Sequence, residues 1–258
     1  YKKFPNLLAN AIGSAYNCSI SKYIKFGDTY ACLINSQSKT PAKTVLFGNS
    51  HAYMYGWPFE EYLKDKNEAG IVIQLSSCLP FIDKNISKKC LSKAKSYYNE
   101  IIENKDLKNV IIGFTWYSKR LTDNQGKKIN DINFKFRKQS IDFLIENLNK
   151  HNKNVYLIGP IEIPKKQFSA EKISRELAFK KIDNYNFFIK KDNFDNNYNK
   201  IIEYYVKNLE LNFLQPHKIL CDNENCFFAD KEGSFFSDGN HLSKYGSLKM
   251  IPLFDKIK

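Results

Sequence analysis

The stretch TVLFGNSHAYMYGWPF at residues 44–59 decides the fold, because one glycine separates an apolar run from a helical pattern. The run 44–48 predicts a buried strand, and residues 51–66 predict a helix. Ser50 stands directly between the two. It is either the residue that caps the helix or a nucleophile displayed at the end of the strand. The stretch alone favours the cap, and a nucleophile requires a base elsewhere in the chain.

The same alternation continues along the chain. Short apolar runs alternate with helices of 12 or more residues, which is typical of a parallel sheet covered on both faces. We therefore expect an α/β fold, a doubly wound three-layer sandwich with a mainly parallel sheet of about five strands. The further strands are expected at 70–75, 109–116, 154–160 and 217–221, with helices at 91–105 and 133–151, a mostly helical region at 166–212 and a terminal helix from Ser243.

The N-terminal part of the chain lacks this regular alternation. Residues 1–40 are expected to be an irregular N-terminal extension or linker that packs on the core domain of residues 41–258. The chain begins at Tyr1, with neither a methionine nor a signal-peptide pattern, so we expect a piece of a longer protein. No uninterrupted apolar run approaches the roughly 18 residues of a membrane span, so these residues are expected to be soluble.

The net charge of +13 comes from lysine, since only Arg120, Arg137 and Arg175 are arginines. Proteins that read nucleic-acid bases rely on bidentate arginine, and no dense basic cluster interleaved with aromatic residues occurs here. Lysines spread along helices are typical of solvated faces. Nucleic acid is therefore disfavoured as a partner, while weak attraction to anionic glycans or lipid head groups stays open.

The six cysteines fall into three pairs that are close in sequence. Locality favours the disulfides Cys18–Cys32, Cys78–Cys90 and Cys221–Cys226 among the 15 or so possible connectivities. No CxxC pair with matching histidines occurs, so a zinc site is not expected, and buried thiols are the other alternative. Disulfides predict an oxidising compartment, such as the periplasm or the cell exterior.

A base for Ser50 occurs near the C-terminus, in the loop FSDGNHLS. There Asp238 precedes His241 by three residues, so its carboxylate can brace one imidazole nitrogen while the other faces Ser50. The predicted topology brings this loop to the sheet edge that carries Ser50. Asp238 and His241 are otherwise caps of the terminal helix, and Asp230 is a rival carboxylate eleven residues before His241. The N–H of Ser50, at a helix start, is an expected oxyanion donor.

These motifs resemble the first and last motif blocks of the SGNH hydrolase family. The variant is similar to the extracytoplasmic SGNH domains of acyltransferase-three polysaccharide O-acetyltransferases, through the extra His51, SSCLPF after the second strand, FTWYS ending the third and CDNENC. The resemblance covers residues 44–258 in layout. It implies an SGNH/flavodoxin-like fold for residues 41–258 and a Ser50–His241–Asp238 triad.

The chain departs from the general SGNH pattern at three places. Asn49 replaces the aspartate of the first block, Ser76 and Ser77 stand where a glycine is usual, and Trp116 stands near the usual asparagine. The other oxyanion donors are thus unassigned. Asn49, His51, Ser76, Ser77 and Trp116 are candidates for oxyanion or substrate binding. His51 is alternatively a structural residue and Trp116 a core or rim residue. His151 and His217 are expected at the surface or at helix ends.

The resemblance implies acetyl transfer through an acyl-serine to a hydroxyl of a bacterial surface polysaccharide, such as an O-antigen or lipooligosaccharide. It implies no bound cofactor or metal. The acetyl group, ultimately from acetyl-CoA, would come from a membrane-bound acyltransferase domain upstream or in a separate chain. The domain would be monomeric, on the periplasmic face, and tethered to the inner membrane in the full-length protein. The alternatives are a carbohydrate acetyl esterase with the same triad and a non-catalytic glycan-binding module.

Overall fold

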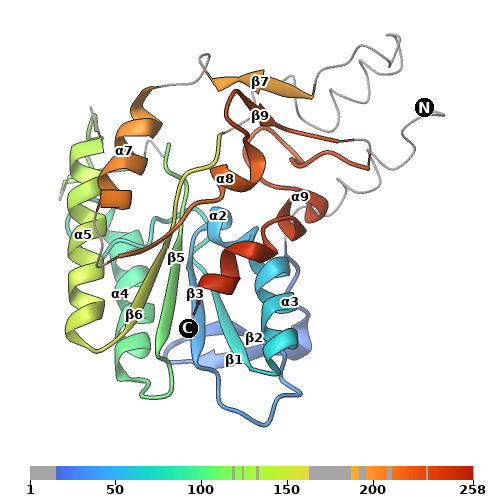
Figure 1. Ribbon diagram of the computed structural model, residues 1–258. Helices are drawn as coiled ribbons and strands as arrows, with labels where there is room; N and C mark the ends of the chain where they lie inside the picture. Colours follow the sequence, from blue (N-terminus) through green and yellow to red (C-terminus); the bar gives the residue numbers. More distant parts are fainter. Residues whose placement is uncertain are drawn as a thin grey trace.

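The computed structural model describes residues 16–117, 120–123, 125–131, 134–162, 187–191, 196–207, 211–230 and 232–257. A seven-stranded sheet in the order β1-β2-β4-β3-β5-β6-β8 forms its centre (Figure 1). The strands are β1 (Tyr23–Phe26), β2 (Thr29–Ile34), β3 (Thr44–Gly48), β4 (Gly70–Gln74), β5 (Asn109–Gly113), β6 (Asn154–Ile158) and β8 (Asn212–Leu214).

Five of these strands are parallel, as the alternation of strands and helices predicts. β3 lies in the middle, between β4 and β5, and β6 and β8 follow on the side of β5. Gly48, at the end of β3, lies opposite Gln74 on one side and Gly113 on the other. Ser50 therefore follows the central strand at the carboxyl edge of the sheet, where ligands bind in doubly wound folds.

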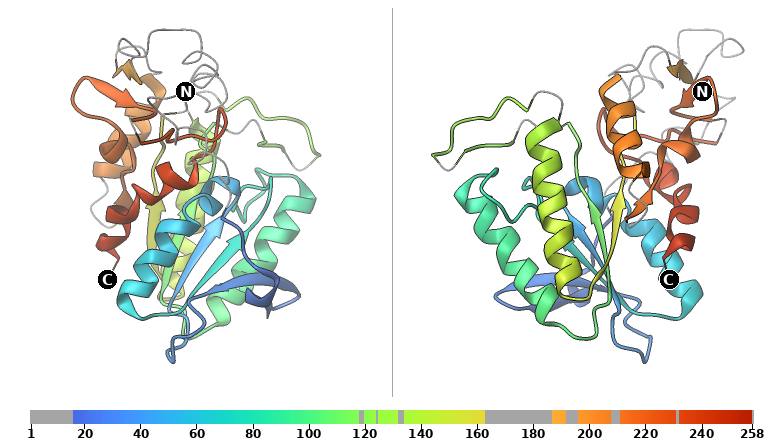
Figure 2. Two further views of the ribbon diagram at one scale, coloured as in Figure 1. Left: turned by 90° about the vertical axis from the view of Figure 1, so that its right-hand side faces the viewer. Right: turned by 60° about the vertical axis from the view of Figure 1, so that its left-hand side comes forward.

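Helices cover both faces of the sheet, which gives the expected three layers. Figures 1 and 2 show α4 and α5 on one side and α3 with the C-terminal helices on the other. The helices are α2 (Ser50–Tyr53), α3 (Gly56–Lys66), α4 (Lys88–Glu103), α5 (Lys135–Lys150), α7 (Asn196–Lys207), α8 (His217–Leu220) and α9 (Lys244–Leu248), with 3-10 turns η1 (Ile20–Lys22) and η6 (Ile251–Lys256). Among the described residues no helix has the length and apolarity needed to cross a membrane.

The central strands are apolar on both faces, and alternate residues belong to different halves of the core. In β3, Val45 and Phe47 pack in the half that contains α4 and α5, whereas Leu46 packs in the half that contains α3. All three side chains are fully buried. A near-continuous apolar strand of this kind is what a sheet covered on both faces requires.

Gly48 is required by a close approach of backbones. A Cβ at this position would lie 1.7 Å from the carbonyl oxygen of Gly113 and 2.8 Å from the Cβ of Ala52. At Gly113 a Cβ would lie 2.9 Å from the Cα of Ala52. The two glycines thus allow α2 to pack directly on the end of the sheet, and this packing fixes the position of Ser50.

The prediction of an irregular segment at residues 1–40 was wrong for its second half. Residues 23–34 form the antiparallel hairpin β1–β2, and β2 pairs antiparallel with β4, so the hairpin extends the central sheet. Phe26 and Ala31 face one half of the core, and Cys32 and Ile34 face the other. This apolar set is too short to stand out in the sequence, but it is sufficient for a sheet edge. Residues 1–15 lie outside the described residues.

The predicted strand at 217–221 was also wrong. His217–Leu220 forms the short helix α8, and the fifth parallel strand is β8, at 212–214. Pro216 precedes α8, with φ −64°, and proline favours a helix start because it has no N–H to leave unpaired. Most of the region expected to be helical at 166–212 lies outside the described residues. Within it, α7 is helical, while Phe188–Lys190 forms β7, which pairs antiparallel with β9 (Asn225–Phe227).

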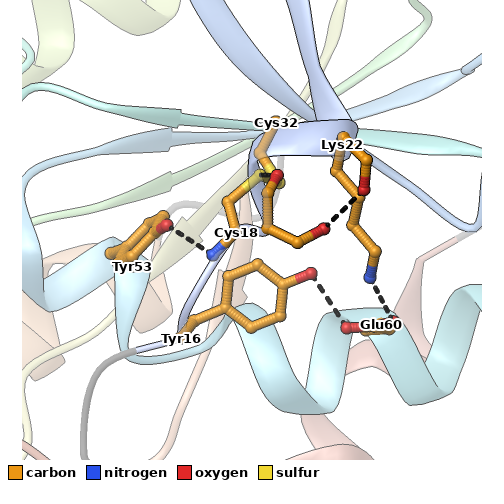
Figure 3. Close-up of a disulfide and its surroundings, with 8 residues drawn as sticks. Tyr16, Cys18, Lys22, Cys32, Tyr53 and Glu60 are labelled. Atoms are coloured by element: carbon orange, nitrogen blue, oxygen red, sulfur yellow. Dashed lines mark hydrogen bonds and ion pairs between the residues drawn. A yellow bond between two sulfur atoms is a disulfide. The ribbon is translucent and has the colours of Figure 1, made fainter.

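The six cysteines form the three predicted disulfides, Cys18–Cys32, Cys78–Cys90 and Cys221–Cys226. The first ties the segment before η1 to β2 (Figure 3). Beside it the Tyr16 hydroxyl donates to Glu60 of α3 at 2.8 Å, and the Cys18 N–H donates to the Tyr53 hydroxyl of α2 at 3.2 Å. The N-terminal segment is thereby fastened to the two helices that follow β3.

Candidate functional site

Ser50 is the first residue of α2, but it does not cap this helix. Asn49 occupies the cap position, and its Oδ1 accepts a hydrogen bond from the His51 N–H at 3.0 Å. The interpretation of Ser50 as a helix cap was therefore wrong, because the preceding asparagine performs that role. Asn49 is 1% exposed, and its side chain has a structural role as the cap of α2. The hydroxyl of Ser50 remains available for another partner.

That partner is His241. The Nε2 atom of His241 lies 2.9 Å from the Ser50 hydroxyl, and its Nδ1 atom lies 2.9 Å from Oδ2 of Asp238. Since Nδ1 faces a carboxylate, the proton of a neutral imidazole sits on Nδ1, and Nε2 is free to accept the serine proton. The three predicted residues thus meet in the serine–base–acid order needed to activate a hydroxyl.

Asp238 is braced by its own turn. Its Oδ1 accepts the N–H of Asn240 at 2.6 Å and the N–H of His241 at 2.7 Å. Burial raises the pKa of the carboxyl, but the hydrogen bonds from the His241 ring and from these two N–H groups outweigh it and bring the pKa to about 2. The carboxylate is therefore ionised near neutral pH, and the exposure of 55% of its side chain also favours the charged form.

Neither Asp238 nor His241 caps the terminal helix. Ser243 caps α9, and its hydroxyl accepts the N–H of Gly246 at 3.0 Å. The rival Asp230 is engaged elsewhere, because it accepts the Tyr245 hydroxyl and forms an ion pair with Lys249, each at 2.9 Å. The cap of the terminal helix is thus Ser243, and Asp230 has a structural role away from His241.

Met54 joins the loop of His241 to the helix of Ser50. The N–H of Leu242 donates to its sulfur at 3.4 Å, and the hydroxyl of Ser247 donates to its carbonyl. Ser247 belongs to α9, so the segment that follows His241 is attached to the end of α2 at two points. The sequence did not point to Met54, because a buried methionine carries no pattern that distinguishes this role from ordinary core packing.

The expected oxyanion donor, the N–H of Ser50, is occupied in this structure. It donates to the carbonyl of Ser76 at 3.3 Å. Ser76 has φ +55°, a left-handed conformation that favours glycine, and it stands at the position where the SGNH pattern has one. Among the described residues, neither the N–H of Ser76 nor that of Ser77 has a hydrogen-bond acceptor. The carbonyl of Ser77 accepts from the Arg120 guanidinium.

His51 lies next to His241. Its ring centroid is 5.0 Å from that of His241, and it is 8% exposed. Burial, and then the charge of the neighbouring His241, lowers the pKa of His51 to about 3. His51 is therefore neutral near pH 7, and it does not place a second positive charge beside the base.

Trp116 lines a small, mainly apolar pocket next to His51. The other walls are Phe114 and Tyr117 after β5, Met54 and Tyr55 after α2, and Ile158, Gly159 and Ile161 at the end of β6. Trp116 is 5% exposed, and its Nε1 donates to the Ile158 carbonyl at 3.2 Å, so it is both a core residue and a pocket wall. His151 is exposed at the end of α5, and His217 begins α8, as expected.

Comparisons with known proteins agree with the family resemblance and with the fold. Residues 17–256 match the model of a family described as "SGNH domain (fused to AT3 domains)". No protein with a curated description matches the sequence significantly. Among solved structures, the periplasmic domain of a lipopolysaccharide acetyltransferase from Salmonella ser. Paratyphi A is similar in fold. The TM-score is 0.64 and the identity 18%, over 85% of this chain and 84% of that chain.

Proposed function

Since the chain belongs to the family of SGNH domains that are fused to AT3 domains, we propose that it transfers an acetyl group to a hydroxyl of a bacterial surface glycan. The observation that carries the proposal is the hydrogen-bonded chain from Asp238 through His241 to Ser50, with both links at 2.9 Å. This arrangement makes a serine hydroxyl nucleophilic, because His241 accepts its proton and Asp238 orients His241.

In the first half-reaction the Ser50 oxygen attacks the acetyl carbonyl of the donor. His241 Nε2 takes the hydroxyl proton, and the Asp238 carboxylate stabilises the imidazolium that results. The bond between the acetyl carbon and the leaving atom of the donor then breaks, and His241 returns the proton to that atom. The products are an acetyl ester on Ser50 and the deacetylated, protonated donor.

In the second half-reaction the acceptor hydroxyl takes the place of the donor. His241 Nε2 removes its proton as its oxygen attacks the acetyl ester, and the bond to the Ser50 oxygen breaks. The proton passes back to Ser50, which regenerates the resting enzyme. The acceptor carries an acetyl ester, and no cofactor is consumed within this domain.

Each half-reaction passes through a tetrahedral oxyanion, which needs hydrogen-bond donors. The candidates are the N–H groups of Ser50, Ser76 and Ser77, because a hydrogen bond joins Ser50 to Ser76. That bond runs from the Ser50 N–H to the Ser76 carbonyl, and the carbonyl has to move away before the Ser50 N–H can bind an oxyanion. Removing a single oxyanion donor typically costs about 100- to 1000-fold in rate. The local conformation at Ser76 thus bears directly on the rate.

The acetyl donor is proposed to be a membrane-bound acyltransferase domain, in the same chain or a separate one, that draws on acetyl-CoA. Fusion to AT3 domains within the family supports this assignment. The three disulfides support an extracytoplasmic position, where such bonds persist. The domain would then act on the periplasmic face, tethered to the inner membrane by its partner.

Hydrolysis of a glycan acetyl ester is the second candidate function. It is favoured by the openness of the triad, because 30% of the His241 side chain and 55% of the Asp238 side chain are exposed to solvent. Water reaching His241 would release the acetyl group as acetate. The difference between the two functions is therefore the acceptor, and the triad acts in the same way in both.

The test supplies the chain with an activated acetyl ester and a mixture of bacterial surface oligosaccharides. We expect acetylated oligosaccharide by mass spectrometry, in amounts that fall to background with Ser50→Ala. Acetate as the sole product, with the oligosaccharides unchanged, would establish the esterase instead. No turnover above the Ser50→Ala control would leave a non-catalytic glycan-binding module.

A further inference from the structure

A second cavity lies between α5 and α7, on the side of the sheet that carries α4. Its volume is about 210 Å³, which suits one sugar unit. The helices are held together across it, because the hydroxyls of Tyr204 and Tyr205 donate to Asp142 at 3.1 and 3.2 Å. Two side chains of the cavity wall are thus held in place by hydrogen bonds. None of the residues that line the cavity belongs to the triad.

The walls combine aromatic rings with cations. The rings belong to Trp116, Phe134, Tyr204 and Tyr205, and the cations are Arg137, Lys138 and Lys200. Aromatic faces pack against the C–H groups of a pyranose ring, and cations bind carboxylates. Among the described residues, no acidic side chain lines the cavity. This composition favours an acidic saccharide over a purely apolar ligand.

Among the residues that the structure describes, one cation of the cavity has no acidic partner. Arg137 faces Asp131 at 3.5 Å, and Lys138 forms an ion pair with Asp142 at 3.2 Å. Among the described residues, Lys200 forms no ion pair. One free positive charge on the wall matches a ligand with one negative charge. A single carboxylate on the sugar satisfies this balance.

Trp116 connects this cavity to the catalytic site. Its side chain lines both the second cavity and the pocket beside His51. Its indole is fixed by the hydrogen bond to the Ile158 carbonyl. The two spaces thus share one wall, the side chain of Trp116. This shared wall places the second cavity next to the pocket that His51 lines.

We propose that the cavity between α5 and α7 is a binding subsite for a sugar unit that carries one carboxylate, with Lys200 as its charge partner and the aromatic walls, Tyr204 among them, as its packing surface. In the context of the proposed function, on which this role rests, the subsite holds an acidic unit of the acceptor glycan while another unit is acetylated. Binding itself requires neither the triad nor an acetyl donor, and it is measured separately.

The test titrates the ¹⁵N-labelled chain with methyl glucuronide and, separately, with the neutral methyl glucoside. The chain has two tryptophans, so two indole N–H signals are expected, and Trp57→Phe assigns them. We expect saturable binding of the glucuronide that shifts the Trp116 signal and leaves that of Trp57 in place. The glucoside should bind about tenfold more weakly, which corresponds to about 1.4 kcal/mol.

Two exposed lysines of α7 provide matched variants. Lys200 lines the cavity, whereas Lys207, seven residues further along the same helix, does not. Lys200→Ala should reduce glucuronide affinity to that of the glucoside, and Lys207→Ala should leave it unchanged. Tyr204→Ala should weaken both sugars, while Tyr204→Phe, which keeps the ring, should bind both. Ser50→Ala should bind as the wild type does.

Equal binding of the two sugars, equal effects of the two lysine variants, or no Trp116 shift at millimolar glucuronide would each overturn the subsite. Binding that follows the expected pattern in a chain without acetyl transfer would retain the subsite and remove the proposed function. Acetyl transfer without glucuronide binding would do the reverse. The two proposals therefore fail separately.

Discussion

The hydroxyl of Ser50 lies 2.9 Å from Nε2 of His241, although 191 residues separate the two along the chain. The contact depends on two short segments at the carboxyl edge of the sheet. Gly48 and Gly113 let α2 sit against the strand ends, and Met54 fastens the loop of His241 to that helix. The relationship between nucleophile and base is thus built into the packing of the core.

The first prediction concerns the carboxylate that orients His241. Asp238→Asn keeps an oxygen for the N–H groups of Asn240 and His241 but puts an amide where Oδ2 faces the imidazole. The wrong tautomer is then favoured, and we expect the rate of acetyl-ester turnover to fall by roughly 10³- to 10⁴-fold. Steady-state kinetics with an activated acetyl ester measure the loss.

Asp230→Asn is the matched control, because Asp230 contacts Tyr245 and Lys249 and not His241. We expect its turnover to stay within a few-fold of the wild type, with a small loss of stability. A larger rate loss in Asp230→Asn than in Asp238→Asn would show that Asp238 is not the acid of the triad.

The second prediction concerns Met54 as a positioning residue. Met54→Leu keeps the apolar volume but removes the sulfur that accepts the Leu242 N–H. A buried N–H left without a partner costs about 1–3 kcal/mol, and here that cost falls on the loop of His241. We expect a lower kcat with an unchanged KM.

Met250→Leu, at the other methionine of the chain, is the control for the loss of sulfur in the core. If both variants lower kcat equally, the effect is one of packing, and the role assigned to Met54 is wrong.

The third prediction concerns the left-handed conformation of Ser76. A β-branched side chain is strained there, so Ser76→Val should lose about 1–2 kcal/mol of unfolding free energy and most of the turnover. Ser76→Gly keeps the backbone N–H and makes movement of the Ser76 carbonyl easier. We expect its turnover to equal or exceed that of the wild type. A Ser76→Gly variant as impaired as Ser76→Val would show that the hydroxyl, not the backbone, is what matters.

The fourth prediction is a pH dependence of stability that comes from His51. Its pKa is about 3 in the folded chain, below the ordinary value of about 6.5. The unfolded state therefore binds a proton first as the pH falls, and this stability is present above pH 6.5 and is lost between 6.5 and 3. From pH 7 to pH 5 the loss is about 2 kcal/mol.

His51→Gln removes this contribution, so its unfolding free energy should fall less steeply from pH 7 to pH 5. Burial, followed by nearby lysines, lowers the pKa of His217 to about 4, so that residue adds a loss in the same range to both proteins. The difference between their denaturant curves isolates His51. Parallel pH profiles would mean that His51 takes up a proton as readily in the folded chain as in the unfolded one.

The fifth prediction concerns the disulfide that closes the N-terminal segment. Cys18 and Cys32 are 14 residues apart, and replacing both with serine should cost about 3 kcal/mol of unfolding free energy, by loop entropy. Cys221 and Cys226 are 5 residues apart, so the same change there should cost about 2 kcal/mol. Chemical denaturation of both variants tests the order, and a larger loss for the shorter loop would contradict it.

The sequence was sufficient for the parts of the fold that repeat a strong pattern. The apolar runs of β3, β4, β5 and β6 predicted the parallel sheet, and local cysteine spacing predicted all three disulfides. Ser50, Asp238 and His241 were found because the chemistry of a nucleophile demands a base and an acid at one edge of the sheet. The structure brings these three together as expected.

Other features depend on tertiary contacts that no local pattern records. The hairpin β1–β2 gains its stability from pairing with β4, and HKIL reads as a strand until Pro216 is seen to start a helix. Ser50 was a plausible cap because serine often is one, yet Asn49 beside it took the role. The conformation of Ser76, and the wall that Trp116 shares between two cavities, follow from packing alone.

The central claim is that Ser50 carries the acetyl group, and acid-quenched peptide mass spectrometry tests it most directly. After brief mixing with an activated acetyl ester, we predict one acetylated peptide, modified at Ser50, which disappears when an acceptor glycan is added. His241→Ala should prevent its formation, since no base then activates the hydroxyl. Turnover with no acetyl group on Ser50, or an acetylated peptide that persists in Ser50→Ala, would contradict the account.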